Sequence, residues 1–380
     1  MKVVKGLIGV TLAVSVLTGC GVFDTAQGEG KTIVISDDVA LQSTMEDAEV
    51  SLSKPEKVSL NEKITYQQLL GVANEELYFV KNNSLYQSDL AGINPVKIED
   101  IEVKELSKNH KKALSVENGK IKLYNLDTNE VVDLGNYKEN DGDVGFADQE
   151  GNYICYYSFS TNNYILIDTE TKKEKSLDFK KLFNKKDFSF ERPTIYKDSI
   201  YLSTHTGKDG TALYKVSFDQ KKEMILGFPH KGDQIARYDF LNDDTIIFNG
   251  TYNEESGIYV YNIKDQEINK IVSGGTDSEG TWTPFYSLSP DGKKLLFDTV
   301  VREDDKFFNN VYLAMLEDGK LTRNIRILEK AELPAVIALL GSWSEDSSTF
   351  FIPRTNKLLG GYDEEKIDYI SVYELDTMNP

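Results

Sequence analysis

The chain has 380 residues and carries 43 lysine and arginine residues against 62 aspartate and glutamate residues, a formal net charge of -19. A surface this acidic repels nucleic-acid phosphates and anionic lipid head groups, which argues against any nucleic-acid partner. The length exceeds that of a usual single core, yet no Pro/Gly/Ser-rich linker divides the middle of the chain. Because long unbroken chains are often built from repeats, a repeat architecture is the first hypothesis.

The N-terminus has the pattern of an export signal. Two lysines precede an apolar run over residues 6–17, which is shorter than the roughly 20 apolar residues of a membrane-spanning helix. The sequence LTGC, ending at Cys20, follows and resembles the lipobox of bacterial lipoproteins. The resemblance implies that residues 1–19 are a cleaved signal peptide and that Cys20 carries the lipid (palmitate among its acyl chains). It also implies that residues 20–30 tether the body to the extracytoplasmic side of the cell membrane. The alternative is an ordinary signal peptide in which this cysteine is coincidental.

The second of the two cysteines, Cys155, lies in the apolar and aromatic segment NYICYYS. No cationic residue flanks it, so a buried structural thiol is the favoured interpretation over a reactive one. If Cys20 carries lipid, no disulfide can form within one chain, and stability must come from the core.

Paired β-rich runs recur along the chain. Each unit begins with a compact apolar or aromatic run, continues through a polar loop and ends in a second run, usually with an aliphatic residue before a tyrosine. Such segments suit half-buried strands. The seven units begin at Leu77, Ala113, Tyr153, Ile200, Thr245, Leu295 and Thr349. This spacing is close to the roughly 40–45 residues of a four-stranded propeller blade.

A further apolar run precedes each unit and another follows most of them, so each repeat is predicted to be a meander of four antiparallel strands, a to d. The a–b hairpin of the sixth unit, SLSPDGKKLLF from Ser287, resembles the S-P-D-G-K-x-L-x-F repeat of TolB-type β-propellers. SWSEDSSTFFI from Ser342 is a degraded second copy, and the other units match in pattern only. The resemblance implies a TolB-like or WD40-like propeller. It makes Asp291 and Gly292 a structural turn rather than part of a catalytic loop.

The seventh unit ends at Thr377 without a fourth strand, and an open blade edge is a liability that proteins avoid. We predict that KTIVIS, at residues 31–36, closes the ring as the outer strand of the seventh blade; EVSLS from Glu49 is the second candidate. ITYQQLLGVA from Ile64 is either helical or strand a of the first blade, and the strand is favoured. The predicted fold is an all-β, seven-bladed β-propeller of four-stranded antiparallel blades, closed by an N-terminal strand and spanning residues 31–377.

In such a meander the b–c and d–a loops share one face of the ring, and these loops are longest in units four to seven. Long loops on a rigid scaffold tend to carry function, and exposed aromatic and arginine side chains are common anchors of protein interfaces. We therefore predict a binding face there; the alternative is that the aromatic residues only cover the blade ends. Its candidate residues are His205, Trp282, Arg302, Phe307, Phe308, Arg354 and Tyr362.

No catalytic constellation is recognised in the sequence. The three histidines, His110, His205 and His230, fall in separate places, and no H-E-x-x-H or G-x-S-x-G motif is present. The acidic stretch NDGDVGFADQEGN from Asn140 lacks the full EF-hand pattern and is interpreted as a solvated loop. We therefore assign no catalytic residue, no metal ligand and no cofactor.

The sequence predicts a lipid-anchored binding or scaffold module for an envelope protein or a cell-wall component, with binding favoured over catalysis. The alternatives are an envelope hydrolase acting on peptide or glycan, and a small-ligand sensor, each with its site at the propeller axis. Acidic, histidine and arginine side chains that converge in a deep axial pocket would favour the enzyme. A closed pocket would favour the sensor, and a flat aromatic rim would favour the binding module.

Overall fold

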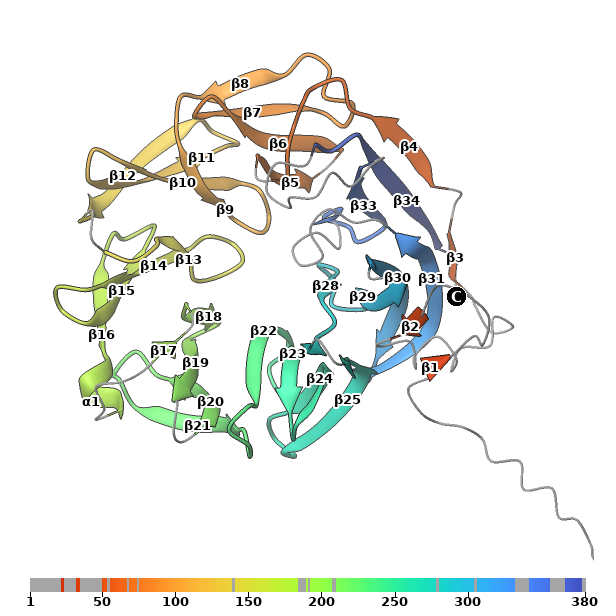
Figure 1. Ribbon diagram of the computed structural model, residues 1–380. Helices are drawn as coiled ribbons and strands as arrows, with labels where there is room; N and C mark the ends of the chain where they lie inside the picture. Colours follow the sequence, from red (N-terminus) through yellow and green to blue (C-terminus); the bar gives the residue numbers. More distant parts are fainter. Residues whose placement is uncertain are drawn as a thin grey trace, which may run out of the picture.

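The computed structural model describes residues 22–23, 32–34, 50–52, 55–66, 68–73, 75–138, 141–183, 189–190, 192–206, 210–277, 280–303, 306–331, 342–355 and 366–377. These residues form an all-β ring of 7 blades around a central axis, which confirms the predicted fold class (Figure 1). Cys20 and Tyr362 lie outside the described residues. Within the described ranges, no helix is long and apolar enough to cross a bilayer.

Each blade is a meander whose first strand lies nearest the axis and whose last strand lies at the rim (Figure 1). Blade one contains β5 (Leu69–Ala73), β6 (Glu76–Lys81), β7 (Ser84–Asp89) and β8 (Val96–Glu99). Blade two contains β9 (Val103–Leu106), β10 (Lys112–Glu117), β11 (Lys120–Asn125) and β12 (Glu130–Asn136). Blade three contains β13 (Gly145–Phe146), β14 (Tyr153–Ser158), β15 (Asn163–Asp168) and β16 (Glu174–Asp178). As expected, the segment from Ile64 leads into the inner strand of blade one.

Blades four to six have longer b and c strands than blades one to three. Blade four contains β18 (Thr194–Tyr196), β19 (Ser199–Thr206), β20 (Gly210–Val216) and β21 (Lys222–Gly227). Blade five contains β22 (Gln234–Asn242), β23 (Thr245–Tyr252), β24 (Glu255–Asn262) and β25 (Glu267–Ser273). Blade six contains β28 (Tyr286–Leu288), β29 (Lys294–Glu303), β30 (Lys306–Glu317) and β31 (Lys320–Ala331). Blade seven contains β32 (Ser342–Trp343), β33 (Thr349–Arg354) and β34 (Tyr369–Thr377).

Apolar clusters fill the spaces between neighbouring blades. On β29, Leu295 and Phe297 pack toward blade five, whereas Leu296 packs toward blade seven. Successive side chains of a strand point to opposite faces, and both faces of a blade are covered, so the b and c strands are apolar on both sides. Among the described residues, every one of the spaces between adjacent blades holds such a cluster. A blade therefore cannot bury its apolar faces without both neighbours.

Ring closure differs in part from the sequence prediction. The outer strand of blade seven is supplied by β3 (Val50–Leu52) and β4 (Glu56–Ser59), which both pair antiparallel with β34. The expectation that residues 31–36 close the ring was wrong, and the second candidate, from Glu49, is confirmed. β2 (Thr32–Val34) instead pairs with β29 of blade six.

The length of β29 explains why β2 lies at blade six. Strand β28 pairs only with residues 295–297, while β29 continues to Glu303, so the inner edge of β29 is open beyond that point. β2 covers part of this edge, with Val34 opposite Val301, and β1 (Val22–Phe23) pairs with β2 in turn. Covering an open edge in this way removes a row of unpaired backbone groups. β17 (Ser189–Phe190) covers the corresponding part of β19 in blade four.

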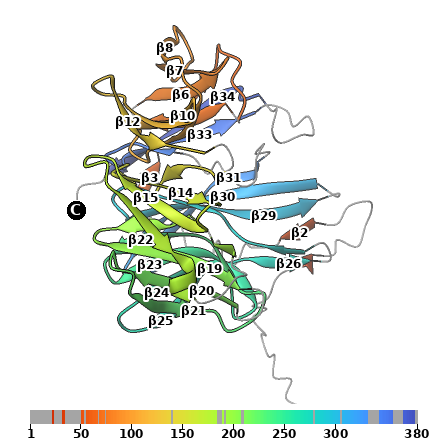
Figure 2. The same cartoon turned by 90° about the vertical axis from the view of Figure 1, so that its left-hand side faces the viewer.

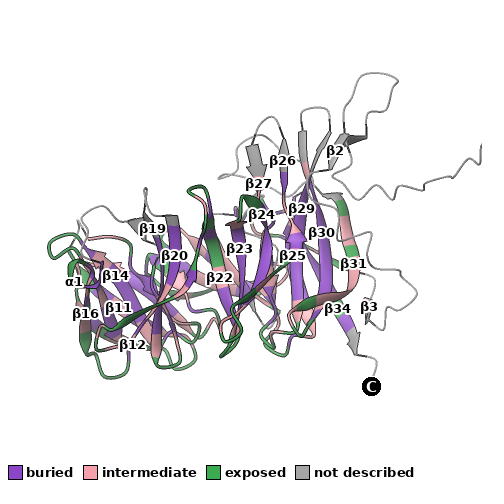
Figure 3. Cartoon of the chain, turned by 90° about the horizontal axis from the view of Figure 1, so that it is seen from below, coloured by how far each residue is buried: buried purple, intermediate pink, exposed green. Residues whose placement is uncertain are grey.

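One face of the ring carries extensions that the other face lacks. The hairpin of β29 and β30 rises above the disc at the b–c side, beside the hairpin of β26 (Gly275–Asp277) and β27 (Gly280–Trp282) (Figures 2 and 3). The sequence analysis did not predict α1 (Phe179–Phe183), whose buried side chains pack between blades three and four. The Asp178 carboxylate caps α1 by accepting the Lys181 N–H at 2.9 Å.

Candidate functional site

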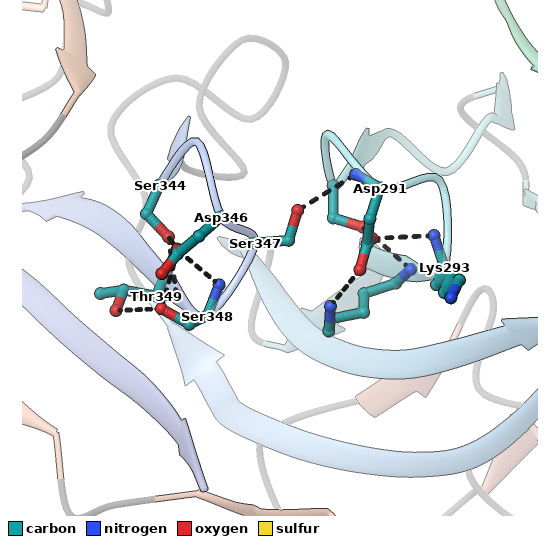
Figure 4. Close-up of polar contacts among 9 residues, drawn as sticks. Asp291, Lys293, Ser344, Asp346, Ser347, Ser348 and Thr349 are labelled. Carbon is teal, nitrogen blue, oxygen red and sulfur yellow. Dashed lines mark hydrogen bonds and ion pairs between the residues drawn. The ribbon is translucent and has the colours of Figure 1, made fainter. Parts of the chain in front are cut away.

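The a–b turn of blade six uses its acidic side chain to hold the backbone (Figure 4). Asp291 Oδ1 accepts hydrogen bonds from Ser289 Oγ at 2.6 Å and from the Lys293 N–H at 3.0 Å, while Lys294 Nζ lies 2.6 Å from Oδ2. Burial alone would raise the pKa of Asp291, but these contacts lower the pKa below its usual value. The carboxylate is thus engaged within the turn, as the structural interpretation of the motif predicted.

Blade seven repeats this turn. Asp346 Oδ1 accepts hydrogen bonds from Ser344 Oγ at 2.6 Å and from the Ser348 N–H at 3.0 Å. Ser347 Oγ in turn accepts the Asp291 N–H at 3.1 Å, so the two a–b turns are tied to each other (Figure 4). The motif therefore connects adjacent blades as well as shaping each turn.

A third copy, in blade two, places a histidine where blade six has a glycine. Ser107 Oγ donates to Asn109 Oδ1 at 2.7 Å, and His110 adopts the left-handed backbone conformation with φ 55°. The imidazole stacks on the Tyr78 ring with centroids 5.8 Å apart. A Cβ at Gly71 would lie 2.1 Å from His110 Nε2, so blade one makes room for the ring. Burial lowers the pKa of His110, which favours the neutral imidazole.

Three of the predicted face residues meet in the blade-six hairpin. Arg302 in β29 stands opposite Phe307 in β30, and Phe308 stands opposite Val301. Arg302 is also opposite Ile33 of β2, so the N-terminal strand lies along this part of the hairpin. The sequence analysis did not anticipate this cover.

The other predicted face residues lie on different blades. His205 is on β19 of blade four, and Trp282 is half-buried on β27, where its carbonyl oxygen accepts the Ser256 hydroxyl at 2.7 Å. Arg354 is on β33 of blade seven, with its guanidinium 5.9 Å from the centroid of the Tyr369 ring. These residues share the b–c side but are spread around the ring, and a binding function for them stays a prediction.

The hollow at the axis lies on the opposite, a–b side. A cavity of about 850 Å³ is bounded by the inner strands β9, β13, β18 and β22, which lie toward the centre of the ring in Figure 1. Exposed residues of the a–b turns, including Lys108, Glu150 and Lys197, also line it, so the cavity opens on that face. We call it the axial pocket.

An ion pair reaches across the axial pocket. Asp239, on β22 of blade five, lies with Oδ1 3.2 Å from Lys108 Nζ of blade two and Oδ2 3.2 Å from Arg237 Nε. Its side chain is only 9% exposed. Burial would raise the pKa of Asp239, but the charges of Arg237 and Lys108 outweigh burial and lower the pKa. Asp239 is therefore a buried carboxylate that stays ionised because two cations contact it.

A second ion pair braces the wall of the pocket. Arg192, in the connection between blades three and four, pairs with Glu105 on β9 of blade two. Both side chains lie over Gly145 of β13, where an added Cβ would come within 2.1 Å of the guanidinium and 2.2 Å of Glu105 Oε2. Glycine at this position therefore lets the pair pack directly on the backbone.

The remaining lining combines carboxylates and aromatic rings. Asp148 accepts the Tyr153 N–H at 2.9 Å, and burial, with Glu150 nearby, raises its pKa. On the other side, the Tyr196 and Phe240 rings stack with centroids 4.1 Å apart. The solvated-loop interpretation therefore does not hold for Asp148, which is partly buried and holds the a–b turn of blade three.

Acidic and histidine side chains converge on the axial pocket, as the envelope-hydrolase alternative requires, although three of the carboxylates have partners within the ring. Asp239 and Glu105 are ion-paired, and Asp148 holds a turn. Within the described ranges, no group of three or more His, Cys, Asp or Glu could hold a metal ion. Cys155 is fully buried, and burial raises its pKa to about 12, which keeps the thiol protonated.

The sequence analysis placed the sites of its two alternative functions at the propeller axis but named no residue of the pocket, because the central contact joins residues 131 positions apart. The a–b turns looked minimal, and attention went to the long loops on the other side. The presence of lysine and histidine in the turn around Lys108 and His110 was the signal available in the sequence.

No protein-family model and no curated protein matches this sequence. Among solved structures, the chain is similar to an oligogalacturonate lyase in complex with manganese, with 11% identity, a TM-score of 0.54, and 91% of this chain and 98% of that chain covered. Similar structures also include TolB from Acinetobacter baumannii, with 16% identity, a TM-score of 0.39 and 66% and 65% coverage. The WD40 repeats of RRP9 match with 10% identity, a TM-score of 0.48 and 85% and 100% coverage. At 11% identity, the likeness to the oligogalacturonate lyase concerns the fold alone.

Proposed function

We propose that this protein is a lipid-anchored, extracytoplasmic β-propeller that binds an envelope protein or a cell-wall component through the axial pocket. The anchor rests on the signal sequence that ends at Cys20, since two or more acyl chains hold a protein firmly on a membrane. The acidic body keeps its distance from anionic head groups and leaves the ring free to meet a partner.

The observation that carries this proposal is the pocket of about 850 Å³ at the axis, whose wall is held in place by ion pairs between different blades. Binding sites are usually preformed hollows that combine apolar surface with a few placed polar groups. The Tyr196 and Phe240 pair supplies the apolar wall, and Asp239 supplies a buried charge. Pre-ordered walls reduce the entropy that a ligand must overcome on binding.

Site-specific photo-crosslinking in intact cells tests this assignment. A photoreactive amino acid at Glu150, on the pocket rim, should capture a partner, whereas the same residue at Val131, exposed on the outer strand of blade two, should not. A probe at Phe308 reports on the predicted b–c face. Capture from Phe308 alone would overturn the proposal in favour of that face, and capture from Val131 equal to that from Glu150 would show contact without specificity.

The location is tested in the same cells. Cys20→Ala should move the protein from the membrane fraction to the soluble fraction, because the acyl chains are then absent. Unchanged retention in the membrane fraction would contradict the lipid anchor.

A small-ligand sensor is the second candidate function. The axial pocket falls within the roughly 300–1,000 Å³ range of small-molecule sites. A sensor predicts a small compound that co-purifies with the protein and no macromolecular adduct from Glu150. Mass spectrometry of the native protein after mild purification, set beside the cross-linking, separates the two functions.

A further inference from the structure

Asp239 presents a buried negative charge to the axial pocket, and its partners hold it loosely. The distances to Lys108 Nζ and Arg237 Nε, both 3.2 Å, are longer than the roughly 2.7–2.9 Å of well-formed charge-assisted hydrogen bonds. An ionised carboxylate can accept about four hydrogen bonds. Asp239 therefore has capacity to bind a better-placed cation.

Arg237 and Lys108 differ in how firmly the fold holds their side chains at the wall of the axial pocket. Arg237 stands two positions before Asp239 on the same strand, and its guanidinium lies 5.3 Å from the centroid of the Tyr286 ring. Lys108 comes from the a–b turn of blade two on the far side of the axis, on a flexible four-carbon stem that is 40% exposed. Lys108 can leave without disturbing a strand, whereas Arg237 is part of the blade.

The rest of the pocket also suits a positively charged group on an alkyl chain. Lys197 is ion-paired with Asp243 on the rim, and burial lowers the pKa of His110. Asp148 and Glu150 add two carboxylates to the lining, with the charge of Lys112 acting on Asp148. The lining is therefore rich in acidic groups, and the Tyr196–Phe240 wall offers apolar surface to an aliphatic stem.

We propose that the axial pocket is a binding site for a primary alkylammonium group with a lysine-like stem, and that Lys108 occupies this site until such a ligand displaces it. The proposal rests on the proposed function and adds the chemistry of the group that the pocket recognises. The chain's own lysine shows that a stem of this length reaches Asp239. The ligand group can come from a lysine side chain of a polypeptide or from a small amine.

Chemical rescue of a vacated site tests the proposal. Removing the Lys108 side chain with Lys108→Ala leaves the Asp239 carboxylate without one of its cations. n-Pentylamine, which is protonated at neutral pH, should then bind the full-length protein in detergent roughly tenfold more tightly than it binds the wild type. Isothermal titration and thermal unfolding with increasing amine measure this difference. n-Pentanol, with the same stem and no charge, should leave both proteins unchanged.

Matched variants separate site binding from general effects. Lys108→Met keeps the stem but not the charge, so its side chain fills the slot and should block the amine. Lys120→Ala removes a lysine from an exposed ion pair with Asp133 in the same blade and should bind the amine as weakly as the wild type does. The proposal would be overturned if Lys108→Ala and the wild type bound the amine with equal affinity. It would also be overturned if Lys108→Met bound the amine as tightly as Lys108→Ala does.

The source of the ammonium group is distinguished by a second probe. A blocked Gly-Lys-Gly peptide that binds the wild type more tightly than n-pentylamine does supports a polypeptide ligand, and the reverse order supports a small amine.

The outcomes also separate this inference from the proposed function. If n-pentylamine binds Lys108→Ala but no cross-linked adduct forms at Glu150, the ammonium site is supported and the proposal of a macromolecular partner is overturned. If an adduct forms but the amine does not bind, the ammonium site is overturned and the macromolecular partner is supported.

Discussion

On the a–b side of the ring, the carboxylates of Asp239, Asp291 and Asp346 are held by hydroxyls, backbone N–H groups or cations, and their pKa values are lowered. In the half of blade six nearer the b–c hairpin, Asp298 is fully buried. Its Oδ1 accepts the Phe285 N–H at 2.7 Å, but its Oδ2 has no hydrogen-bond partner among the described residues. Burial raises the pKa of Asp298 to about 7. Asp298 therefore responds to pH in the opposite direction from Asp239, Asp291 and Asp346, and on the a–b side Asp148 also has a raised pKa.

Neighbouring atoms reinforce this contrast. The side-chain oxygens Thr299 Oγ1, Asn309 Oδ1 and Asn249 Oδ1 are also buried without a hydrogen-bond partner among the described residues. Burying a polar group without a partner costs free energy, whereas a satisfied network rigidifies the fold. Incomplete networks are not confined to this half of the ring, since Asp239 Oδ2 at the axial pocket also lacks a hydrogen-bond partner among the described residues and is held by its ion pair with Arg237.

The largest expected effect comes from the backbone of blade five on the b–c side. Gly250 in β23 has φ 155°, and an added Cβ would lie 2.0 Å from the Gln234 carbonyl oxygen. Gly250→Ala should therefore lower the free energy of unfolding by roughly 3 kcal/mol or more. Gly232→Ala is the matched control, since nothing lies within 4 Å of its added Cβ. Denaturant titration compares them, and equal midpoints would contradict the close backbone approach.

A smaller effect of opposite sign is expected at Asp298. Its folded-state pKa of about 7 lies above the value of 3.8 for an unperturbed aspartate, so the stability of the protonated form is lost as pH rises from about 4 to about 7. Asp298→Asn should raise stability at pH 8 by about 2 kcal/mol, below the upper limit of about 4 kcal/mol set by the shift.

Thermal unfolding between pH 5 and pH 8 checks this prediction. The melting temperature of Asp298→Asn should be nearly flat over that range while that of the wild type falls. Asp265→Asn, at an exposed aspartate of blade five, is the control for loss of a surface charge. Parallel pH profiles for Asp298→Asn and the wild type would show that Asp298 is already ionised in the folded protein.

The smallest expected effect concerns the a–b turn of blade seven. Hydrogen bonds from Ser344 and Ser348 lower the pKa of Asp346 to about 2. Because the folded-state pKa is depressed, the stabilisation is present above the unfolded value near 4 and is lost as pH falls toward 2. Asp346→Asn should cost no more than about 1 kcal/mol at pH 7, since the turn is exposed. Wild type and variant should converge near pH 2, and a constant difference down to that pH would contradict the assignment.

The propeller could be predicted because its cause is local. Every b and c strand alternates apolar residues toward two neighbouring blades, as Leu295, Leu296 and Phe297 do, and this pattern repeats at blade spacing. The Asp291 turn could be predicted for the same reason, because the hydrogen bonds within the turn join residues at most five positions apart. Its hydrogen bond to Ser347 of blade seven joins residues 56 positions apart and could not be predicted. The short helix α1 was missed because a single capped turn carries no helical periodicity.

The closing strand and the pocket depend on distant contacts. Residues 31–36 and the segment from Glu49 both look like strands, and only the unpaired length of β29 decides that the first goes to blade six. The Lys108–Asp239 pair depends on the curvature of the ring, which brings the inner strands of blades two and five close together. Neither the unpaired length of β29 nor the curvature of the ring can be read from a single sequence.

The way blade seven is completed has a consequence for biosynthesis. β4 emerges from the ribosome before any blade, yet its partner β34 is the last described strand to be made. Domains tend to form from the N-terminus as the chain grows, but here β4 cannot pair until β34 has been made. The ring of a nascent chain therefore cannot close until translation ends. A premature stop anywhere before Tyr369 yields a product without β34, so β4 has no strand to pair with.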